Sequence, residues 1–157
     1  MKKGITFFVL IFWMAVIFYF SAQTGGKSSD ISQSVGYRIA ESISNCFHLD
    51  KTTEELSQQA EQMQLVIRKG AHMTEYAILA IFTLLHICCY RGKPKKFWWW
   101  SWGFCILYAA TDEIHQLFVP GREGRFLDVC IDSIGSLIGI LLFMLVYVKC
   151  LKRKETR

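Results

Sequence analysis

Ionisable side chains gather in two short segments of an otherwise apolar sequence. The segment TDEIHQLFVPGREGRFLD, from Thr111 to Asp128, holds seven of them and stands between two hydrophobic runs. The segment RKGAHMTEY, residues 68–76, is charged in a similar way. Carboxylates and histidine can transfer protons, whereas lysine and arginine bind phosphate or carboxylate groups. Together the two segments therefore indicate a polar site for an anionic ligand, with or without chemistry on that ligand.

Eight residues form the predicted site. His72, Asp112 and Glu113 could act as acid or base. The sequence contains no serine nucleophile elbow, no glycine-rich phosphate loop and no zincin helix. The ligand would be bound by the side chains of Lys69, Tyr76, Gln116, Arg122 and Asp128, with Arg68 and Arg125 as further cations.

Neither a metal nor a cofactor is assigned to this site. Several carboxylates beside His72 could hold a divalent ion, but their spacing matches no known ligand pattern. We therefore predict no metal site and leave the cofactor unknown. The six cysteines are scattered, in neither a disulfide nor a zinc spacing, and we interpret them as small apolar packing residues.

Four hydrophobic segments must position these residues. They cover residues 5–22, 68–90, 97–119 and 129–148, and each is close to the roughly 20 residues that cross a hydrocarbon core about 30 Å thick. With 52% hydrophobic residues, the sequence is typical of a membrane protein rather than a soluble one. We predict an all-α polytopic membrane protein, a bundle of four transmembrane helices that forms a single domain over residues 1–157.

The first segment admits a second interpretation. Lys2 and Lys3 precede it and the small residues Ser21 and Ala22 follow it, as in a secretory signal peptide. Its apolar run is longer and more aromatic than a signal core of about 7 to 15 residues, which favours an uncleaved helix. Cleavage would leave three helices.

Basic residues set the expected orientation. They lie at the N-terminus, between the second and third segments, and in the C-terminal tail, so the positive-inside rule places both termini in the cytoplasm. Residues 97–102, FWWWSW, would then form an aromatic belt at the inner interface. Topology accounts for most of the net charge of +5, and we predict no nucleic-acid partner. The basic residues are Lys2, Lys3, Arg91, Lys93, Lys95, Lys96, Lys149, Lys152, Arg153, Lys154 and Arg157.

The outer loop between the first two segments, residues 23–65, has amphipathic patterns. An apolar residue recurs at every fourth position from Ile31 to Ile43, and SSD, residues 28–30, could cap that helix. Thr52 and Glu55 form a capping box before a second helix that continues into the second hydrophobic segment. We expect these helices to lie on the outer surface or to cover the bundle. A substrate gate is the alternative.

Polar groups on three helices are expected at one depth. At about 1.5 Å per residue from the cytoplasmic ends, Tyr76, Asp112 and Asp132 lie roughly 22, 24 and 26 Å up, in the outer third of the bilayer. An ionised residue at a helix centre costs about 2.5 to 3.5 kcal/mol even on the lenient insertion scale. The carboxylates, including Glu113, must therefore pair with nearby cations or line a wet cavity. Gly135 and Gly139 form a GxxxG spacing that could face another helix or a second copy.

These residues carry a resemblance to a known family. RKGAHMTEYAILA, DEIHQLFVPGREGRFLDVCIDSIGSLIG and the FSAQ that ends the first segment resemble motifs of the VanZ-like proteins, a family named for a teicoplanin-resistance membrane protein. Asp132 stands where the family has Asn or Asp. The resemblance covers most of the chain except the outer loop. The family pattern falls on Ser21, Gln23, Lys69, His72, Tyr76, Asp112, Glu113, Gln116, Pro120, Gly121, Arg122, Asp128, Gly135 and Gly139.

The resemblance implies a bacterial cell membrane and, for some members, reduced susceptibility to glycopeptide or lipoglycopeptide antibiotics. Three functions stay open. The chain could be an enzyme acting on an outer-leaflet membrane lipid or lipid-linked cell-envelope precursor. It could bind or transport an anionic headgroup, or couple protons through His72 and the carboxylates. The charges could also serve only to hold the helices together in an accessory protein, and a homo-oligomer is compatible with each of these.

Overall fold

All the regular secondary structure in the described part of the protein is helical. The computed structural model describes residues 2–91 and 94–155, and the side chains within 3–90 and 94–149. No strand occurs among these residues, so the predicted all-α class is confirmed. The helices are α1 (Lys2–Ser21), α2 (Gly25–Cys46), α3 (Thr53–Arg91), the short 3-10 helix η1 (Pro94–Lys96), α4 (Trp98–Gln116) and α5 (Phe126–Glu155).

Three of the described helices are long and apolar enough to cross a membrane. They are α1 over Lys3–Ser21, α3 over Thr53–Tyr90 and α5 over Phe126–Lys149. These correspond to the predicted spans 5–22, 68–90 and 129–148, and they are the helices of a membrane protein.

The fourth predicted span, 97–119, forms α4, which is shorter and more polar than expected. α4 ends at Gln116 because the chain then turns, with the Val119 amide donating to the Gln116 carbonyl 3.0 Å away. Its last two turns contain Asp112 and Glu113, and the polar residues of this helix keep it outside the set of three apolar helices.

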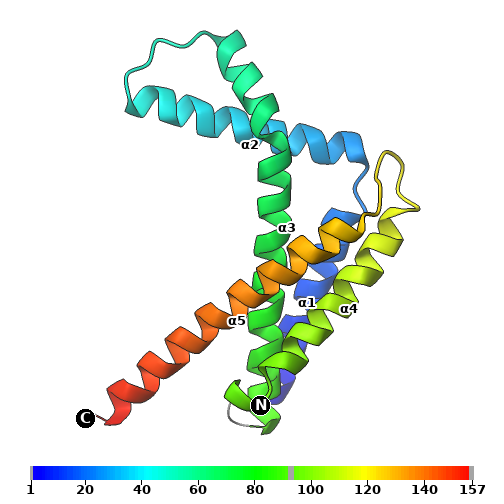
Figure 1. Cartoon of the computed structure of the whole chain (residues 1–157), viewed down its shortest axis with the longest axis vertical. Helices are drawn as coiled ribbons and strands as arrows, with labels where there is room; N and C mark the ends of the chain where they lie inside the picture. The colour runs from blue at the N-terminus through cyan, green and yellow to red at the C-terminus, as the bar shows by residue number, and fades with distance from the viewer. Residues whose placement is uncertain (1, 92–93, 156–157) are drawn as a thin grey trace.

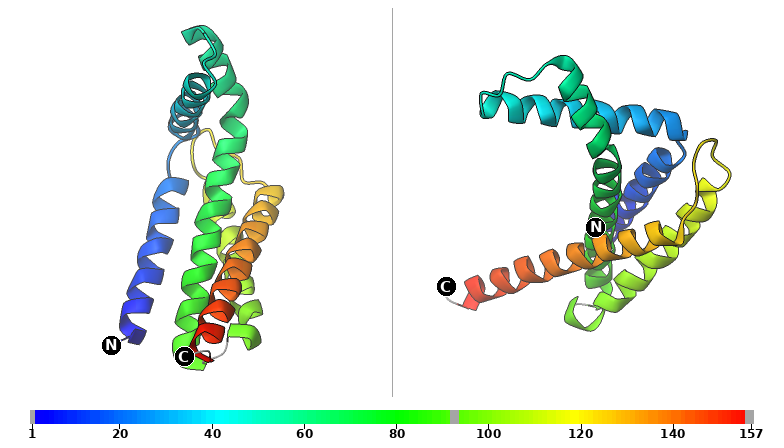
Figure 2. Two further views of the ribbon diagram at one scale, coloured as in Figure 1. Left: turned by 90° about the vertical axis from the view of Figure 1, so that its left-hand side faces the viewer. Right: turned by 45° about the horizontal axis from the view of Figure 1, so that its top comes forward.

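The long helix α3 organises the fold. It packs against α1, α2, α4 and α5. α3 and α5 run in one general direction, and α1 and α4 run in the other (Figure 1). The start of α1 and the ends of α3 and α5 therefore lie toward one end of the bundle, whereas α2 lies across the other end (Figures 1 and 2).

The glycine spacing of α5 serves the contact with α3. A Cβ atom added to Gly139 would lie 2.1 Å from the Ala77 carbonyl oxygen, and one added to Gly135 would lie 2.4 Å from that of Met73. Both distances are far shorter than a van der Waals contact, so α5 can approach α3 this closely only with glycine at these positions. The sequence left either another helix of the chain or a second copy as the partner of these glycines. In the structure the partner is α3 of the same chain.

The helix α2 packs through its small residues and leaves its aliphatic row exposed. Ser32, Gly36, Ala40 and Ser44 are buried, and the backbone of Gly36 lies close to that of Ala60 on α3. The aliphatic row of Ile31, Val35, Ile39 and Ile43 is 37 to 45% exposed.

The outer loop begins differently from the prediction and ends as predicted. Thr24 is the N-cap of α2, accepting from the Lys27 amide, so the expected cap at residues 28–30 is wrong by about one turn. The capping box before α3 is confirmed, since the Thr52 amide donates to the Glu55 carboxylate at 2.8 Å and the Glu55 amide donates to the Thr52 hydroxyl at 3.3 Å. α3 then continues without a break into the hydrophobic segment.

Tryptophans and cysteines have mixed environments. Trp98, Trp99 and Trp100 are exposed, as an interface belt would be, whereas the indole of Trp102 donates to the Ser133 carbonyl of α5. Cys105 is in the core, but Cys46 at the end of α2 is exposed and is not the packing residue we expected.

Several basic residues used to predict orientation lie outside the described part of the chain. Lys93 and Arg157 are not among the described residues, and neither are the side chains of Lys2, Arg91, Lys152, Arg153, Lys154 and Cys150.

Candidate functional site

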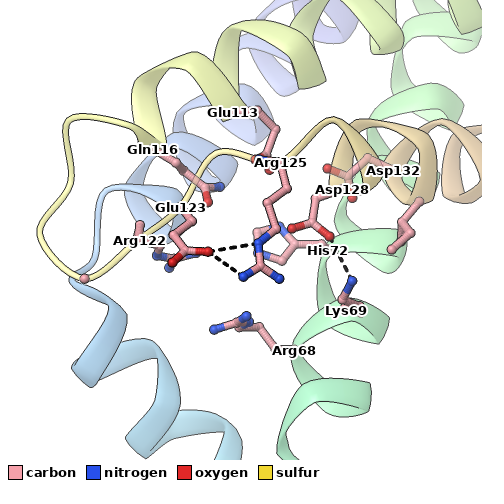
Figure 3. Close-up of a pocket in the computed structure, with 12 residues that line it drawn as sticks. Arg68, Lys69, His72, Glu113, Gln116, Arg122, Glu123, Arg125, Asp128 and Asp132 are labelled. Carbon is pink, nitrogen blue, oxygen red and sulfur yellow. Dashed lines mark hydrogen bonds and ion pairs between the residues drawn. The ribbon is translucent and has the colours of Figure 1, made fainter.

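A polar cavity of about 360 Å³ lies between α3, the end of α4 and the start of α5. Its size is within the range of small-molecule sites. The loop between α4 and α5, residues 117–125, is called the hairpin and forms one wall (Figure 3). The lining residues are Arg68, Lys69, His72, Glu113, Gln116, Gly121, Arg122, Glu123, Arg125, Asp128, Ile131 and Asp132.

α3 presents three basic residues to the cavity. Arg68, Lys69 and His72 share one face because residues three and four apart stack along a helix. The Lys69 Nζ atom lies 3.0 Å from the Asp128 Oδ1 atom on α5 (Figure 3). The His72 Nδ1 atom lies 3.6 Å from the Glu75 Oε2 atom, one turn farther along α3. The first pair joins α3 to α5 at the cavity.

The last turns of α4 hold the adjoining elements in place. The Gln116 amide nitrogen donates to the Ser21 hydroxyl of α1 at 3.0 Å and to the Asp112 carboxylate at 3.3 Å. The Glu113 Oε2 atom accepts the Arg125 backbone amide at 2.8 Å. In this structure Glu113 therefore fixes the chain just before α5.

Arg122 joins the hairpin to the end of α1. Its guanidinium donates to the backbone carbonyls of Gln23 at 3.0 Å and of Phe20 at 3.1 Å. Burial lowers the pKa of Arg122, and the neighbouring charge of Arg68 lowers it further. Two guanidinium groups thus face the same region of the cavity, an arrangement that an anion would stabilise.

A close backbone contact fixes the hairpin beside α2. The Gly25 amide donates to the Pro120 carbonyl at 3.1 Å, and Gly121 has a φ of 72°. This left-handed conformation suits glycine. A Cβ atom on Gly25 would lie 1.8 Å from the Gly121 carbonyl oxygen, so the corner between α1 and α2 requires glycine to meet the hairpin. Pro120 and Gly121 therefore form the turn between α4 and α5.

The two remaining arginines of the cavity differ in their partners. Arg125 forms an ion pair with Glu123, and this carboxylate raises the pKa of Arg125 (Figure 3). Arg68 makes neither a hydrogen bond nor an ion pair with any residue in the described part of the chain. Its donors are therefore available to a ligand.

The expected pairing of the buried carboxylates takes a different form. Asp132 is 1% exposed and Asp112 is 3% exposed, and neither forms an ion pair within the described residues. Asp132 and Glu113 line the cavity instead, which was the other expectation. Asp112 neither forms an ion pair nor lines the cavity. It lies one turn before Gln116 on α4 and accepts a hydrogen bond from the Gln116 side chain.

The cavity brings together six of the eight predicted site residues: Lys69, His72, Glu113, Gln116, Arg122 and Asp128. Tyr76 and Asp112 lie outside its lining. Tyr76 is fully buried in the core, and its hydroxyl has no hydrogen-bond partner among the described residues.

The predicted site did not include Glu123 and Asp132, which line the cavity, or Glu75, which lies beside His72. Asp132 had been recognised as a buried charge, and its position one turn after Asp128 on the same face of α5 was the signal for including it. Glu75 lies three residues after His72, a spacing that places the two side chains together.

The described residues offer no metal site. Among them, no three histidine, cysteine, aspartate or glutamate side chains come close enough together to hold a metal ion. The titratable groups are instead distributed along three helices and the hairpin.

The chain was compared with known proteins. A model of the VanZ/LLP1 family matches residues 6–147, nearly the whole chain. The chain belongs to the VanZ/LLP1 family. No curated protein and no solved structure gave a significant match.

The VanZ/LLP1 motifs read from the sequence converge in space. Ser21, from the FSAQ motif, accepts the hydrogen bond from Gln116 in the DEIHQ segment, and Arg122 of the PGR turn donates to the Gln23 carbonyl. Lys69 of the RKGAH motif binds Asp128 at the start of α5. In this VanZ/LLP1 protein two of the three segments line the cavity, and hydrogen bonds of Ser21 and Gln23 hold the end of α1 against them.

Proposed function

We propose that this protein binds the anionic headgroup of a cell-envelope amphiphile, a membrane lipid or a lipid-linked precursor, in the cavity between α3 and the hairpin. The observation that carries the proposal is the pair of Arg68 and Arg122, two guanidinium groups facing one region with no carboxylate ion-paired to either among the described residues. Guanidinium groups bind phosphate and carboxylate through parallel hydrogen bonds. A phosphate at this point would offset their mutual repulsion.

The proposal includes four membrane crossings. Because α3 and α5 run in the same direction, the chain must return across the bundle between them, and α4 is the segment that does so (Figure 1). Its 19 residues extend about 28 Å at 1.5 Å per residue, close to the thickness of a hydrocarbon core. Its buried carboxylates face the bundle interior, which is compatible with crossing.

The cavity would then lie at the outer leaflet of a bacterial cell membrane. Lys3, Lys95, Lys96 and Lys149 mark the opposite end of the bundle as cytoplasmic, together with both termini. α2 lies across the outer end, and its exposed row from Ile31 to Ile43 is suited to contact with the interfacial region of the membrane. An amphiphile could place its headgroup in the cavity while its chains stay in the bilayer.

A catalytic role has one specific observation in its favour. The His72 Nδ1 atom and the Glu75 Oε2 atom are 3.6 Å apart. Both residues line a second cavity of about 240 Å³, and this cavity shares Arg68 and Arg122 with the first. A histidine beside a carboxylate can transfer protons to a bound group.

Altered glycopeptide or lipoglycopeptide susceptibility would follow from either role, binding or catalysis, if the bound amphiphile is a target of these antibiotics or a precursor of the cell envelope.

Binding of a polyprenyl phosphate to the full-length protein in detergent tests the proposal. We expect Arg68→Ala to weaken binding by about tenfold or more, the effect of losing a charged hydrogen bond. Thermal stability without ligand should stay unchanged or rise slightly, because Arg68 makes no hydrogen bond or ion pair within the described residues and its charge repels that of Arg122. Arg38→Ala on the exposed face of α2 is the matched control.

Two results would count against this function. Equal affinity of Arg68→Ala and wild type would show that the anion does not bind between the arginines. Lower thermal stability of Arg68→Ala would instead place this charge among the groups that hold the bundle together. Susceptibility of a deletion strain that carries each variant, scored beside membrane abundance, extends the same comparison to cells.

A further inference from the structure

One side chain of the cavity has no partner for its polar atoms. Asp132 is 1% exposed, and neither of its carboxyl oxygens accepts a hydrogen bond within the described residues. The nearby Ser136 hydroxyl donates to the backbone carbonyl of Asp132 rather than to its carboxyl group. Buried polar atoms are normally hydrogen-bonded. Since Asp132 lines the cavity, a ligand bound there is in position to provide the missing donor (Figure 3).

Three cations of the cavity are engaged elsewhere, and Arg68 forms no ion pair with Asp132. Lys69 binds Asp128, Arg125 binds Glu123, and Arg122 donates to two backbone carbonyls. Two further carboxylates, those of Glu113 and Asp128, line the same cavity. The unpartnered oxygens of Asp132 therefore favour a positively charged donor.

The cavity is polarised along the bundle. α3 enters the bundle from the outer end with Arg68 before His72, and α5 enters with Asp128 before Asp132, which lies about 6 Å deeper at 1.5 Å per residue. Arg68 and Arg122 thus lie at the outer part of the cavity, and Asp132 lies at its inner part (Figure 3). A ligand that matches this order carries an anion and a hydrogen-bond-donating cation at its two ends.

We propose that the headgroup is an aminophosphate of the phosphoethanolamine type, an inference that rests on the proposed function of the same cavity. Its phosphate lies against Arg68 and Arg122, and its ammonium group donates to the carboxylate of Asp132. A primary ammonium has three N–H donors for the two unpartnered oxygens. A hydroxyl group could donate as well, but it would leave the surrounding negative charge without compensation.

Lipids with identical acyl chains and different headgroups test this inference on the full-length protein in detergent. Binding of phosphatidylethanolamine, phosphatidylcholine and phosphatidylglycerol is measured by native mass spectrometry. We expect phosphatidylethanolamine to bind about tenfold more tightly than phosphatidylcholine, whose methylated nitrogen has no N–H to donate. Asp132→Asn should remove this preference, whereas Asp30→Asn on the exposed face of α2 should retain it.

Two further arms complete the design. Soluble phosphoethanolamine is compared with inorganic phosphate as a competitor: stronger competition by phosphoethanolamine supports recognition of the free headgroup. A preference seen only with the lipid supports the same headgroup chemistry supplied from the membrane.

If Asp132→Asn does not fold, the comparison between the ethanolamine and choline lipids on wild-type protein tests the inference by itself, since these two lipids differ only in the N-methyl groups.

The outcomes separate this inference from the proposed function. If the three lipids bind equally and Arg68→Ala still weakens their binding, the proposed ammonium group is overturned and the proposed binding of an anion is retained. Tighter binding of phosphatidylglycerol that is lost in Asp132→Asn would also overturn it, because the donor would then be a hydroxyl group. No binding of any phosphate lipid, with no effect of Arg68→Ala, would remove the proposed function itself.

Discussion

At the scale of single residues, Arg68 and Arg122 have different roles in one cavity. The guanidinium of Arg122 is committed to the carbonyls of Phe20 and Gln23, so it connects the hairpin to α1. Arg68 has no such commitment among the described residues and can turn its five donors toward a ligand. Replacing Arg122 would change fold and binding together, and this makes Arg68 the more informative position.

Glu113 allows a sharper separation of structure from chemistry. Its carboxylate accepts the Arg125 amide at 2.8 Å, a contact that a glutamine oxygen can reproduce. We expect Glu113→Gln to keep wild-type stability, and Glu113→Ala to lose about 1 to 2 kcal/mol by leaving a part-buried amide without an acceptor. Thermal unfolding in detergent measures both, with Glu61→Ala on the exposed face of α3 as the control. A folded Glu113→Gln protein without function would show that the carboxylate charge is required.

At the scale of helices, the contact between α3 and α5 determines the width of the bundle at the cavity. Gly135 and Gly139 bring α5 onto the backbone of Met73 and Ala77. One and two turns nearer the start of α5, the same face carries Asp132 and Asp128, so the glycine contact also sets their positions opposite α3. The close packing of two helices thus positions the acidic wall of the site.

Gly139→Ala tests this contact with a single methyl group. The added Cβ atom would meet the Ala77 carbonyl oxygen at 2.1 Å, and relieving such an overlap between backbones costs about 1 to 3 kcal/mol or more. We expect a lower unfolding temperature and weaker ligand binding. Gly103→Ala in α4 is the matched control, because nothing lies within 4 Å of its added Cβ atom. There alanine should leave stability unchanged or raise it by up to about 1 kcal/mol. Equal behaviour of the two variants would contradict the contact.

At the scale of the whole molecule, the directions of the helices place the cavity at one end of the bundle, near α2 and the hairpin. α1 and α4 run toward the end of the bundle where α2 and the hairpin lie, and α3 and α5 run away from it (Figure 1). Four crossings put both termini on one side, whereas three would put them on opposite sides. The side on which α2 lies is therefore a measurable property of the fold.

Thiol labelling in intact cells measures that side. Cys46 is exposed at the end of α2, so a membrane-impermeant maleimide should modify it from outside, and Cys46→Ser should abolish this labelling. Lys95→Cys in the Cys46→Ser background places an exposed thiol at the opposite end of the bundle. We expect its modification only after the membrane is made permeable, relative to the Cys46→Ser background alone. Labelling of Lys95→Cys in intact cells would refute the proposed orientation.

The sequence by itself determined the helical class, the family and most residues of the candidate site. Long apolar runs and helical periodicity are local properties that a chain displays before it folds, so the segments that became α1, α3 and α5 could be located directly. The high energetic cost of charge in an apolar environment indicated that the polar residues meet, and six of the eight predicted residues line one cavity.

Only the tertiary structure decided which polar groups pair and which remain available. A distance between side chains on different helices depends on how those helices cross, and helix crossing depends on contacts such as Gly139 against Ala77. For this reason the pairing of Lys69 with Asp128, the amide held by Glu113 and the unpartnered oxygens of Asp132 could not be inferred from spacing along the chain.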